Sequence, residues 1–217
     1  MKHIEMVAFG YDCKSENYKL FSGSFIILFE VYSLGSKSWK TLENVPYKFV
    51  YPSKPSNVIV NGDFHWLSKR KDSPGVLLVF LDISNEIFKE MELPKEPLDK
   101  GSWFRNLGVF EGCLCVFVNA NCVHFEIWIM RDYGVQESWT KHCVITHDRF
   151  MGFRSPLLIS SFKSGTILFE VSGKLVVYDP RKKSAMDLNI PGSIQLLQES
   201  WYFESLVLLN SGTYVGC

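Results

Sequence analysis

Hydrophobic and polar residues alternate along much of the chain, in short runs that are separated by polar turns. In one such run Tyr32 and Leu34 alternate with Val31 and Ser33. This period of two is typical of β-strands, whereas the period of 3.6 expected for helices is missing. A strand, a polar turn and a second strand with one large apolar residue occur four times, at residues 29–42, 78–93, 126–142 and 174–190. The pattern predicts an all-β protein.

The four copies are evenly spaced. Equivalent positions in the first strand of each copy lie 49, 48 and 49 residues apart: Tyr32, Leu81, Ile129 and Tyr178. Large residues in the second strand lie 49, 51 and 47 residues apart: Trp39, Phe88, Trp139 and Met186. A repeat of about 50 residues built from strands is typical of the blades of kelch-like propellers.

Tight hairpins precede the repeated strands. The clearest is Asn61-Gly62 between β-branched and aromatic residues, a strong signal for a two-residue hairpin turn. Each unit is therefore expected to contain four strands. We expect an incomplete kelch-like β-propeller with blades at residues 5–43, 57–93, 107–144 and 156–190 and a closing strand at 201–209.

Large aromatic side chains recur within the predicted blades. They have the size needed to fill the space between neighbouring sheets. We expect these side chains to belong to the core: Trp39, Trp66, Phe88, Trp128 and Trp139.

The topology of a four-stranded meander indicates where a partner would bind. The two tight turns of each blade lie at one end, so the longer connections emerge together at the other end, where recognition residues concentrate on rigid scaffolds. These long segments, which include 47–56, 69–75, 94–106 and 145–155, contain aromatic residues beside arginines, a pairing enriched at protein interfaces. The candidate target-binding residues are Arg70, Trp103, Phe104, Arg105, His147, Arg149 and Phe150.

Charge and hydropathy narrow the classes of partner. The chain has 23 Lys and Arg residues and 23 Asp and Glu residues, so it lacks the basic excess needed to neutralise nucleic-acid phosphates or to bind an anionic membrane. Its apolar runs are shorter than the roughly 20 residues of a membrane helix. The N-terminus shows no secretory signal, and we expect the protein in the cytoplasm, the nucleus or both.

Possible metal and catalytic groups have simpler interpretations. Cys113, Cys115, Cys122 and His124 lack the spacing of a zinc knuckle, so we expect core cysteines and no metal or cofactor. Asp12, Asp82 and Asp179 occupy corresponding strand ends, where aspartate caps turns by accepting backbone hydrogen bonds. No motif for nucleophilic or acid–base catalysis is present, which argues against an enzyme.

A series of short motifs follows along nearly the whole chain: Phe9-Gly10-Tyr11-Asp12, Glu30-Val31-Tyr32-Ser33-Leu34, Val60-Asn61-Gly62, His65-Trp66-Leu67, Gly112-Cys113-Leu114-Cys115, Trp128-Ile129-Met130 and Glu204-Ser205-Leu206-Val207. In this order they resemble the F-box-associated domain of plant F-box proteins, the S-locus-F-box-like group included. The resemblance implies a substrate-recognition subunit of an SCF-type E3 ubiquitin ligase, which acts in ubiquitin-dependent degradation and is itself non-catalytic. It does not identify the target protein.

One feature of that family is expected to be absent from this chain. Family members carry an F-box and a first blade ahead of the Gly-Tyr-Asp motif, whereas this sequence starts close to Gly10. The resemblance therefore implies that a Skp1-like adaptor and a cullin would be reached only through an F-box elsewhere in the polypeptide. Two alternatives stay open: an interaction propeller without a ligase role, and a propeller hydrolase.

Overall fold

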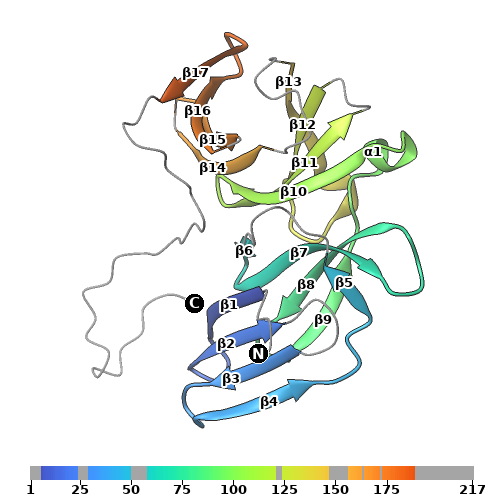
Figure 1. Ribbon diagram of the computed structural model, residues 1–217, viewed down its shortest axis with the longest axis vertical. Helices are drawn as coiled ribbons and strands as arrows, with labels where there is room; N and C mark the ends of the chain where they lie inside the picture. Colours follow the sequence, from blue (N-terminus) through green and yellow to red (C-terminus); the bar gives the residue numbers. More distant parts are fainter. Residues whose placement is uncertain are drawn as a thin grey trace.

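The computed structural model describes residues 6–23, 29–49, 58–120, 124–146, 156–162, 164–171 and 173–188. The expected closing strand at 201–209 lies outside these residues. Within them the chain forms four antiparallel sheets, each a meander of consecutive strands (Figure 1).

The first two sheets are built from residues 6–91. The first contains β1 (Met6–Asp12), β2 (Asn17–Gly23), β3 (Phe29–Ser33) and β4 (Ser38–Leu42). The second contains β5 (Tyr47–Phe49), β6 (Val58–Val60), β7 (Asp63–Arg70), β8 (Val76–Asp82) and β9 (Ile87–Met91).

The last two sheets are built from residues 103–188. The third contains β10 (Trp103–Phe110), β11 (Cys113–Ala120), β12 (His124–Met130) and β13 (Trp139–Ile145). The fourth contains β14 (Leu157–Ser161), β15 (Ile167–Val171), β16 (Lys174–Asp179) and β17 (Ser184–Leu188). Two short helices, α1 (Lys95–Asp99) and η1 (Gln136–Ser138), lie between strands.

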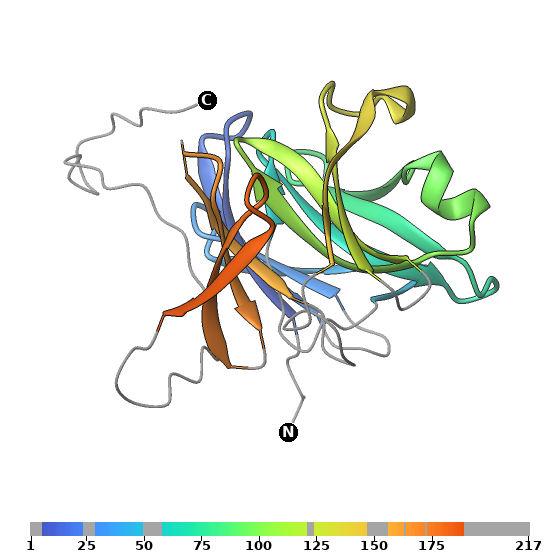
Figure 2. The same ribbon diagram turned by 90° about the horizontal axis from the view of Figure 1, so that it is seen from above.

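The sheets follow one another along an arc, from β1–β4 at the bottom of Figure 1 to β14–β17 at the top. In the view from above, the third and fourth sheets lie in front of the first two (Figure 2). The described residues do not close the arc into a ring. Within the described residues, this arrangement confirms the prediction of an all-β, kelch-like propeller fold with four blades that do not form a closed ring.

The second sheet has a first strand in two pieces. Tyr47 of β5 lies opposite Arg70 and Val58 of β6 lies opposite His65, so both pieces pair with β7. The sheet thus begins at Tyr47, ahead of the expected start at residue 57, because β5 pairs with the end of β7. Tyr47 is buried, and its ring lies 6.2 Å from that of Phe88. The third sheet likewise begins at Trp103, ahead of the expected residue 107.

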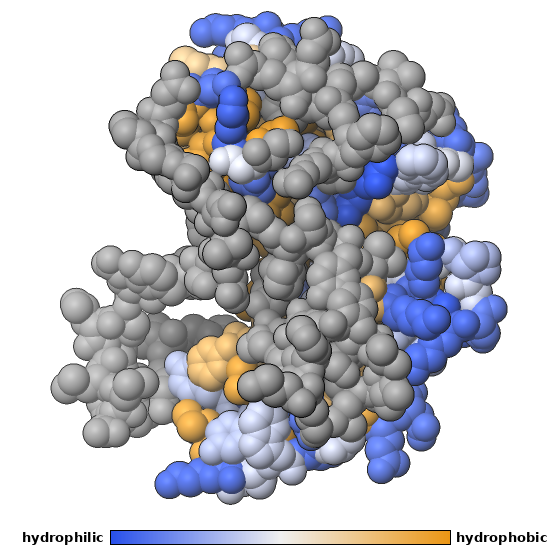
Figure 3. Space-filling model, in the orientation of Figure 1, coloured by the Kyte–Doolittle hydropathy of each residue, from blue (hydrophilic) through white to orange (hydrophobic). Residues whose placement is uncertain are grey.

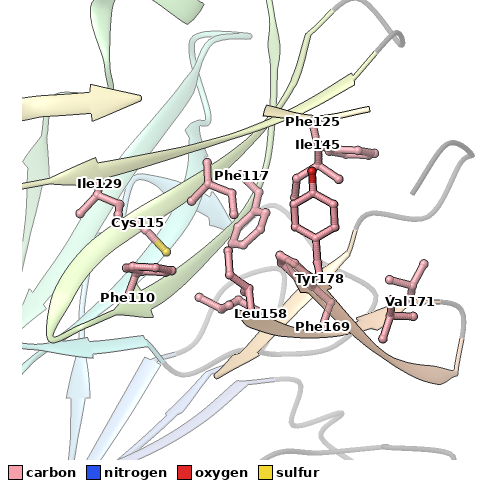
Figure 4. Close-up of a cluster of buried hydrophobic side chains, with 13 residues drawn as sticks. Phe110, Cys115, Phe117, Phe125, Ile129, Ile145, Leu158, Phe169, Val171 and Tyr178 are labelled. Atoms are coloured by element: carbon pink, nitrogen blue, oxygen red, sulfur yellow. The ribbon is translucent and has the colours of Figure 1, made fainter. Parts of the chain in front are cut away.

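Apolar side chains fill the space between successive sheets. Figure 4 shows Phe117 of the third sheet facing Phe169 and Tyr178 of the fourth, in a cluster that also contains Phe110. The rings of Phe117 and Phe169 meet edge to face with their centres 5.8 Å apart. A fully buried aromatic side chain of this size contributes about 2 kcal/mol or more to folding, so these contacts hold the blades together.

Four of the five aromatic residues expected in the core are fully or partly buried. Trp66, Trp128 and Trp139 are buried, and Phe88 packs against the core between the first two sheets. The expectation was wrong for Trp39, which is 55% exposed. It lies opposite Tyr32 on the face of the first sheet that points away from the second sheet.

The three aspartates expected to cap turns do so. Asp12 accepts a hydrogen bond from the backbone N–H of Lys14 at 3.0 Å, and Asp82 accepts one from that of Asn85 at 2.9 Å. Asp179 accepts one from the backbone N–H of Arg181 at 3.0 Å. Their role is to fix the turns that follow β1, β8 and β16.

Candidate protein-binding surface

The residues around Trp103 form the candidate site best defined by the structure. Trp103, Phe104 and Arg105 were expected in a loop, but they are the first three residues of β10. Because side chains alternate along a strand, Trp103 and Phe104 point to opposite faces of the sheet. Trp103 is 58% exposed, whereas Phe104 is only 7% exposed.

Phe104 therefore cannot serve as a contact residue, which corrects the sequence prediction. Its side chain belongs to the core between the second and third sheets, where Leu107, Leu114 and Trp128 are also found. A partner could reach Phe104 only if this core opened. Of the two aromatic residues, Phe104 thus packs in the core, whereas Trp103 is exposed to solvent.

Arg105 lies at an irregularity in the pairing of β10 with β11. The register shifts between Phe104 and Asn106, so Arg105 is the extra residue of a β-bulge. Bulges redirect side chains and are frequent beside functional sites. The centre of the Arg105 guanidinium lies 4.9 Å from the centre of the Trp103 ring, a cation–π contact that holds the two side chains together.

The guanidinium of Arg105 has no charged partner among the described residues. Its Nε atom is buried and has no hydrogen-bond partner there either. A tryptophan held beside an unpaired guanidinium combines apolar area with donors for a carboxylate or carbonyl oxygen.

Asn106 anchors this surface and was not singled out from the sequence. Its Nδ2 atom donates a hydrogen bond to the carbonyl oxygen of Pro156 at 2.9 Å, which connects β10 to the residue just before β14. The side chain is buried. One buried asparagine in a long connection gives no recognisable sequence signal, because its partner is 50 positions away.

Arg70 is less available than Arg105. Its Nε and Nη2 atoms lie 2.8 and 2.7 Å from Oε1 of Glu90, which also accepts a hydrogen bond from the Tyr47 hydroxyl at 2.9 Å. Burial, together with the nearby Glu90 carboxylate, raises the pKa of Tyr47. The guanidinium of Arg70 is thus already matched by a carboxylate of the same sheet.

Three further candidates, His147, Arg149 and Phe150, lie outside the described residues, so their role as contacts stays a prediction. Trp103 and Arg70 both lie at strand ends that adjoin the long connections, as the meander topology requires. The candidate surface is therefore centred on Trp103 and Arg105, and Arg70, which is paired with Glu90, is the weaker candidate.

The cysteines of the third sheet have packing roles. Cys115 is fully buried, and burial raises the pKa of its thiol. Burial also raises the pKa of Cys143 to about 12, so both thiols stay protonated at neutral pH. Within the described part of the chain, no group of three or more His, Cys, Asp or Glu side chains could hold a metal ion.

Comparison with known proteins decides the family. Residues 1–209 match the family described as F-box associated beta propeller domain. The chain belongs to this family. Since the match covers nearly the whole sequence, it confirms the resemblance to plant F-box-associated domains.

Three relatives from Arabidopsis thaliana illustrate the relationship. The chain is 32% identical to F-box protein At3g07870 over 72% of this chain and 42% of that protein. It is 27% identical to F-box protein CPR1 over 95% of this chain and 53% of that protein. It is also 27% identical to F-box/kelch-repeat protein At3g23880 over 76% of this chain and 48% of that protein. The chain thus spans about half the length of these curated relatives.

Among solved structures, the protein lmo1340 from Listeria monocytogenes matches with a TM-score of 0.39 and 12% identity, over 85% of this chain and 69% of that one. This likeness is too low to bear on function. None of the helices in the described ranges is long and apolar enough to cross a membrane.

Proposed function

We propose that this F-box-associated propeller domain is the target-recognition part of an SCF-type E3 ubiquitin ligase. It holds a protein target and is itself non-catalytic. The observation that carries the proposal is the family match over residues 1–209, together with relatives that are named as F-box proteins. A Skp1-like adaptor and a cullin would join the assembly through an F-box carried elsewhere in a longer polypeptide. The site of action would be the cytoplasm, the nucleus or both.

The surface around Trp103 is the proposed point of target contact. Aromatic residues and arginines dominate the energetics of protein interfaces, especially where they are held in place before binding. Trp103 is largely exposed and is held by Arg105, and β10 is anchored through Asn106. Such a rigid display would bind a protein segment that offers an apolar side chain next to a carboxylate or a free carbonyl group.

The ligase role can be tested with a fusion. The chain joined behind the F-box of the relative CPR1 should co-purify with a Skp1-like adaptor, whereas residues 1–217 alone should not. The isolated CPR1 F-box is the positive control for adaptor binding. Retention of the adaptor by residues 1–217 alone would contradict the proposal that the F-box binds the adaptor and the propeller binds the target. Adaptor binding would then lie within the propeller.

A further inference from the structure

The connection between β7 and β8 carries a serine followed by a proline. Residues 71–75 are all exposed, and they include Ser73 and Pro74. The backbone N–H of Ser73 donates a long hydrogen bond of 3.4 Å to the carbonyl oxygen of Arg70. Ser73 thus lies in a solvent-exposed loop that is outside the ladder of the second sheet.

The hydroxyl group of Ser73 is not used by the fold. Among the hydrogen bonds of the described residues, none involves its Oγ atom. Exposed serines in the tight turns of other sheets are different. The Oγ atom of Ser36 lies 2.7 Å from that of Ser38, and the Oγ atom of Ser164 lies 2.8 Å from Oγ1 of Thr166. The Ser73 hydroxyl is therefore accessible to an enzyme without loss of a contact between described residues.

Pro74 makes the loop suitable for a protein kinase. A proline favours an extended backbone at the residue before it, which here is Ser73. Kinases bind their substrate as an extended segment, and one class of them selects a proline directly after the modified residue. The chain has a second such pair, Ser155-Pro156, but Pro156 is buried and its carbonyl oxygen accepts the hydrogen bond from Asn106. In the folded chain a kinase can contact Pro74 but not Pro156.

Two lysines lie opposite each other near the base of this loop. Lys48 of β5 pairs in register with Lys69 of β7, and both are exposed. Figure 3 shows strongly hydrophilic residues at the right edge of the molecule, where this connection lies in Figure 1. Like charges directly opposite each other on neighbouring strands destabilise a sheet. An anion placed beside Lys48 and Lys69 would remove this cost.

The other cations of this region already have partners. Arg70 pairs with Glu90 at 2.7 Å, and the Nζ atom of Lys71 donates a hydrogen bond to the carbonyl oxygen of Val45 at 2.9 Å. No ion pair within the described residues involves the two lysines at the base of the loop. These two lysines are therefore left to receive an anion.

We propose that Ser73 is a phosphorylation site for a proline-directed Ser/Thr protein kinase, and that Lys48 and Lys69 hold the phosphate. The bond between the γ-phosphorus of ATP and its bridging oxygen breaks, and a bond forms from that phosphorus to the Oγ atom of Ser73. The hydroxyl proton passes to a base of the kinase, and ADP leaves. The phosphate adds about 1.5–2 negative charges at pH 7. This modification does not depend on the proposed ligase role.

Ser184 of the fourth sheet is a matched comparison for Ser73. It is also exposed, and it follows three basic residues at 181–183. It is not followed by proline, and it pairs with Asp179 where β17 begins. A residue paired in this way can enter a kinase cleft only if its hairpin opens. Phosphorylation of Ser73 requires no such opening.

Kinase assays with mass spectrometric mapping test the site. The full chain is incubated with ATP, Mg²⁺ and one of two proline-directed enzymes, a mitogen-activated protein kinase or a cyclin-dependent kinase. Ser73 should be phosphorylated, whereas Ser155 and Ser184 should not. Pro74→Ala should lower the initial rate at Ser73 about tenfold. Ser184→Ala should leave that rate unchanged, and the circular dichroism of each variant reports that it is folded.

Phosphorus-31 NMR of the phosphorylated chain tests the role of the lysines. The second pKa of phosphoserine is about 6, and nearby ammonium groups lower it because they favour the dianion. Replacing both lysines, Lys48→Gln with Lys69→Gln, should therefore raise this pKa by about half a unit. The control is Lys14→Gln with Lys37→Gln, which removes two exposed lysines from turns of the first sheet and should leave the pKa unchanged.

Three results would overturn the proposal. The first is a Ser73 that neither kinase phosphorylates. The second is an unchanged rate for Pro74→Ala, because the proline would then not be recognised. The third is the same phosphate pKa in the two double lysine variants, which would show that Lys48 and Lys69 do not hold the phosphate.

Discussion

The Nε2 atom of His65 lies 2.8 Å from the hydroxyl oxygen of Tyr133, and this hydrogen bond connects the second sheet to the turn that precedes η1 in the third sheet. His65 is fully buried, and the ring of Tyr133 meets it edge to face with centres 5.6 Å apart. The pair thus joins the second and third blades.

Tyr133→Phe should lower the free energy of unfolding by about 1–3 kcal/mol, because it leaves a buried imidazole nitrogen without its partner. Chemical denaturation measures the change. Tyr32→Phe is the matched control, since Tyr32 packs against Trp39 on the exposed face of the first sheet. A loss for Tyr133→Phe no larger than that for Tyr32→Phe would show that the hydrogen bond contributes nothing to stability.

The burial of His65 also predicts that the protein loses stability in acid. Burial lowers the pKa of His65 from 6.5 to about 4. The unfolded chain takes up this proton near pH 6.5 and the folded chain only near pH 4, so stability is lost as the pH falls between these values and is unaffected above them. The loss should be about 3 kcal/mol larger for the parent than for His65→Gln. Urea denaturation measures the stability of both proteins at pH 7 and at pH 4. If the parent and His65→Gln lose the same amount of stability between these pH values, the lowered pKa of His65 is refuted.

A buried ion network connects the first and second blades. The Nζ atom of Lys19 lies 2.9 Å from Asp12, 3.0 Å from Glu86 and 3.0 Å from the carbonyl oxygen of Ile83. Lys19→Met leaves Asp12 buried without its cation and should cost about 3 kcal/mol of stability. Lys40, which also pairs with Glu86 but is largely exposed, provides the control: Lys40→Met should cost under about 1 kcal/mol. Similar losses for both variants would contradict this account.

The different roles of neighbouring residues in β10 give a further prediction. Phe104→Ala should cost about 3 kcal/mol of stability, because it opens a cavity between the second and third sheets. Trp103→Ala should change stability by less than about 0.5 kcal/mol, because its side chain faces solvent. Thermal unfolding of the two variants measures these losses. If Trp103→Ala is the less stable variant, the assignment of Phe104 to the core and of Trp103 to the surface is wrong.

The sequence predicted those features of the fold that depend on local periodicity. The period of two and the even spacing of Tyr32, Leu81, Ile129 and Tyr178 predicted four meanders, and Asn61-Gly62 predicted a tight turn in which both residues have positive φ angles. The aspartate caps followed in the same way, because their partners lie within three positions. Local chemistry was sufficient for these features.

The rest depended on contacts between distant residues. Tyr47–Phe49 resembled a loop until its pairing with β7 was known, and Trp39 resembled a core residue until the first sheet proved to have an exposed face. Phe104 was assigned to a binding surface because its neighbours suit one, and the alternation of β10 turned it inward. No local pattern distinguishes the two faces of a sheet when both are apolar.

Target recognition through Trp103 and Arg105 is the central claim, and it is tested most directly by quantifying ubiquitin-remnant peptides from plant cells. The cells express the F-box fusion in three forms: the parent, Trp103→Ala with Arg105→Ala, and a control with Phe162→Ala and Arg181→Ala. Phe162 and Arg181 are an exposed aromatic residue and an arginine in hairpin turns of the fourth sheet. We predict proteins whose ubiquitylation rises with the parent and the control but not with the Trp103 and Arg105 variant. An identical set of modified proteins in all three would contradict the account.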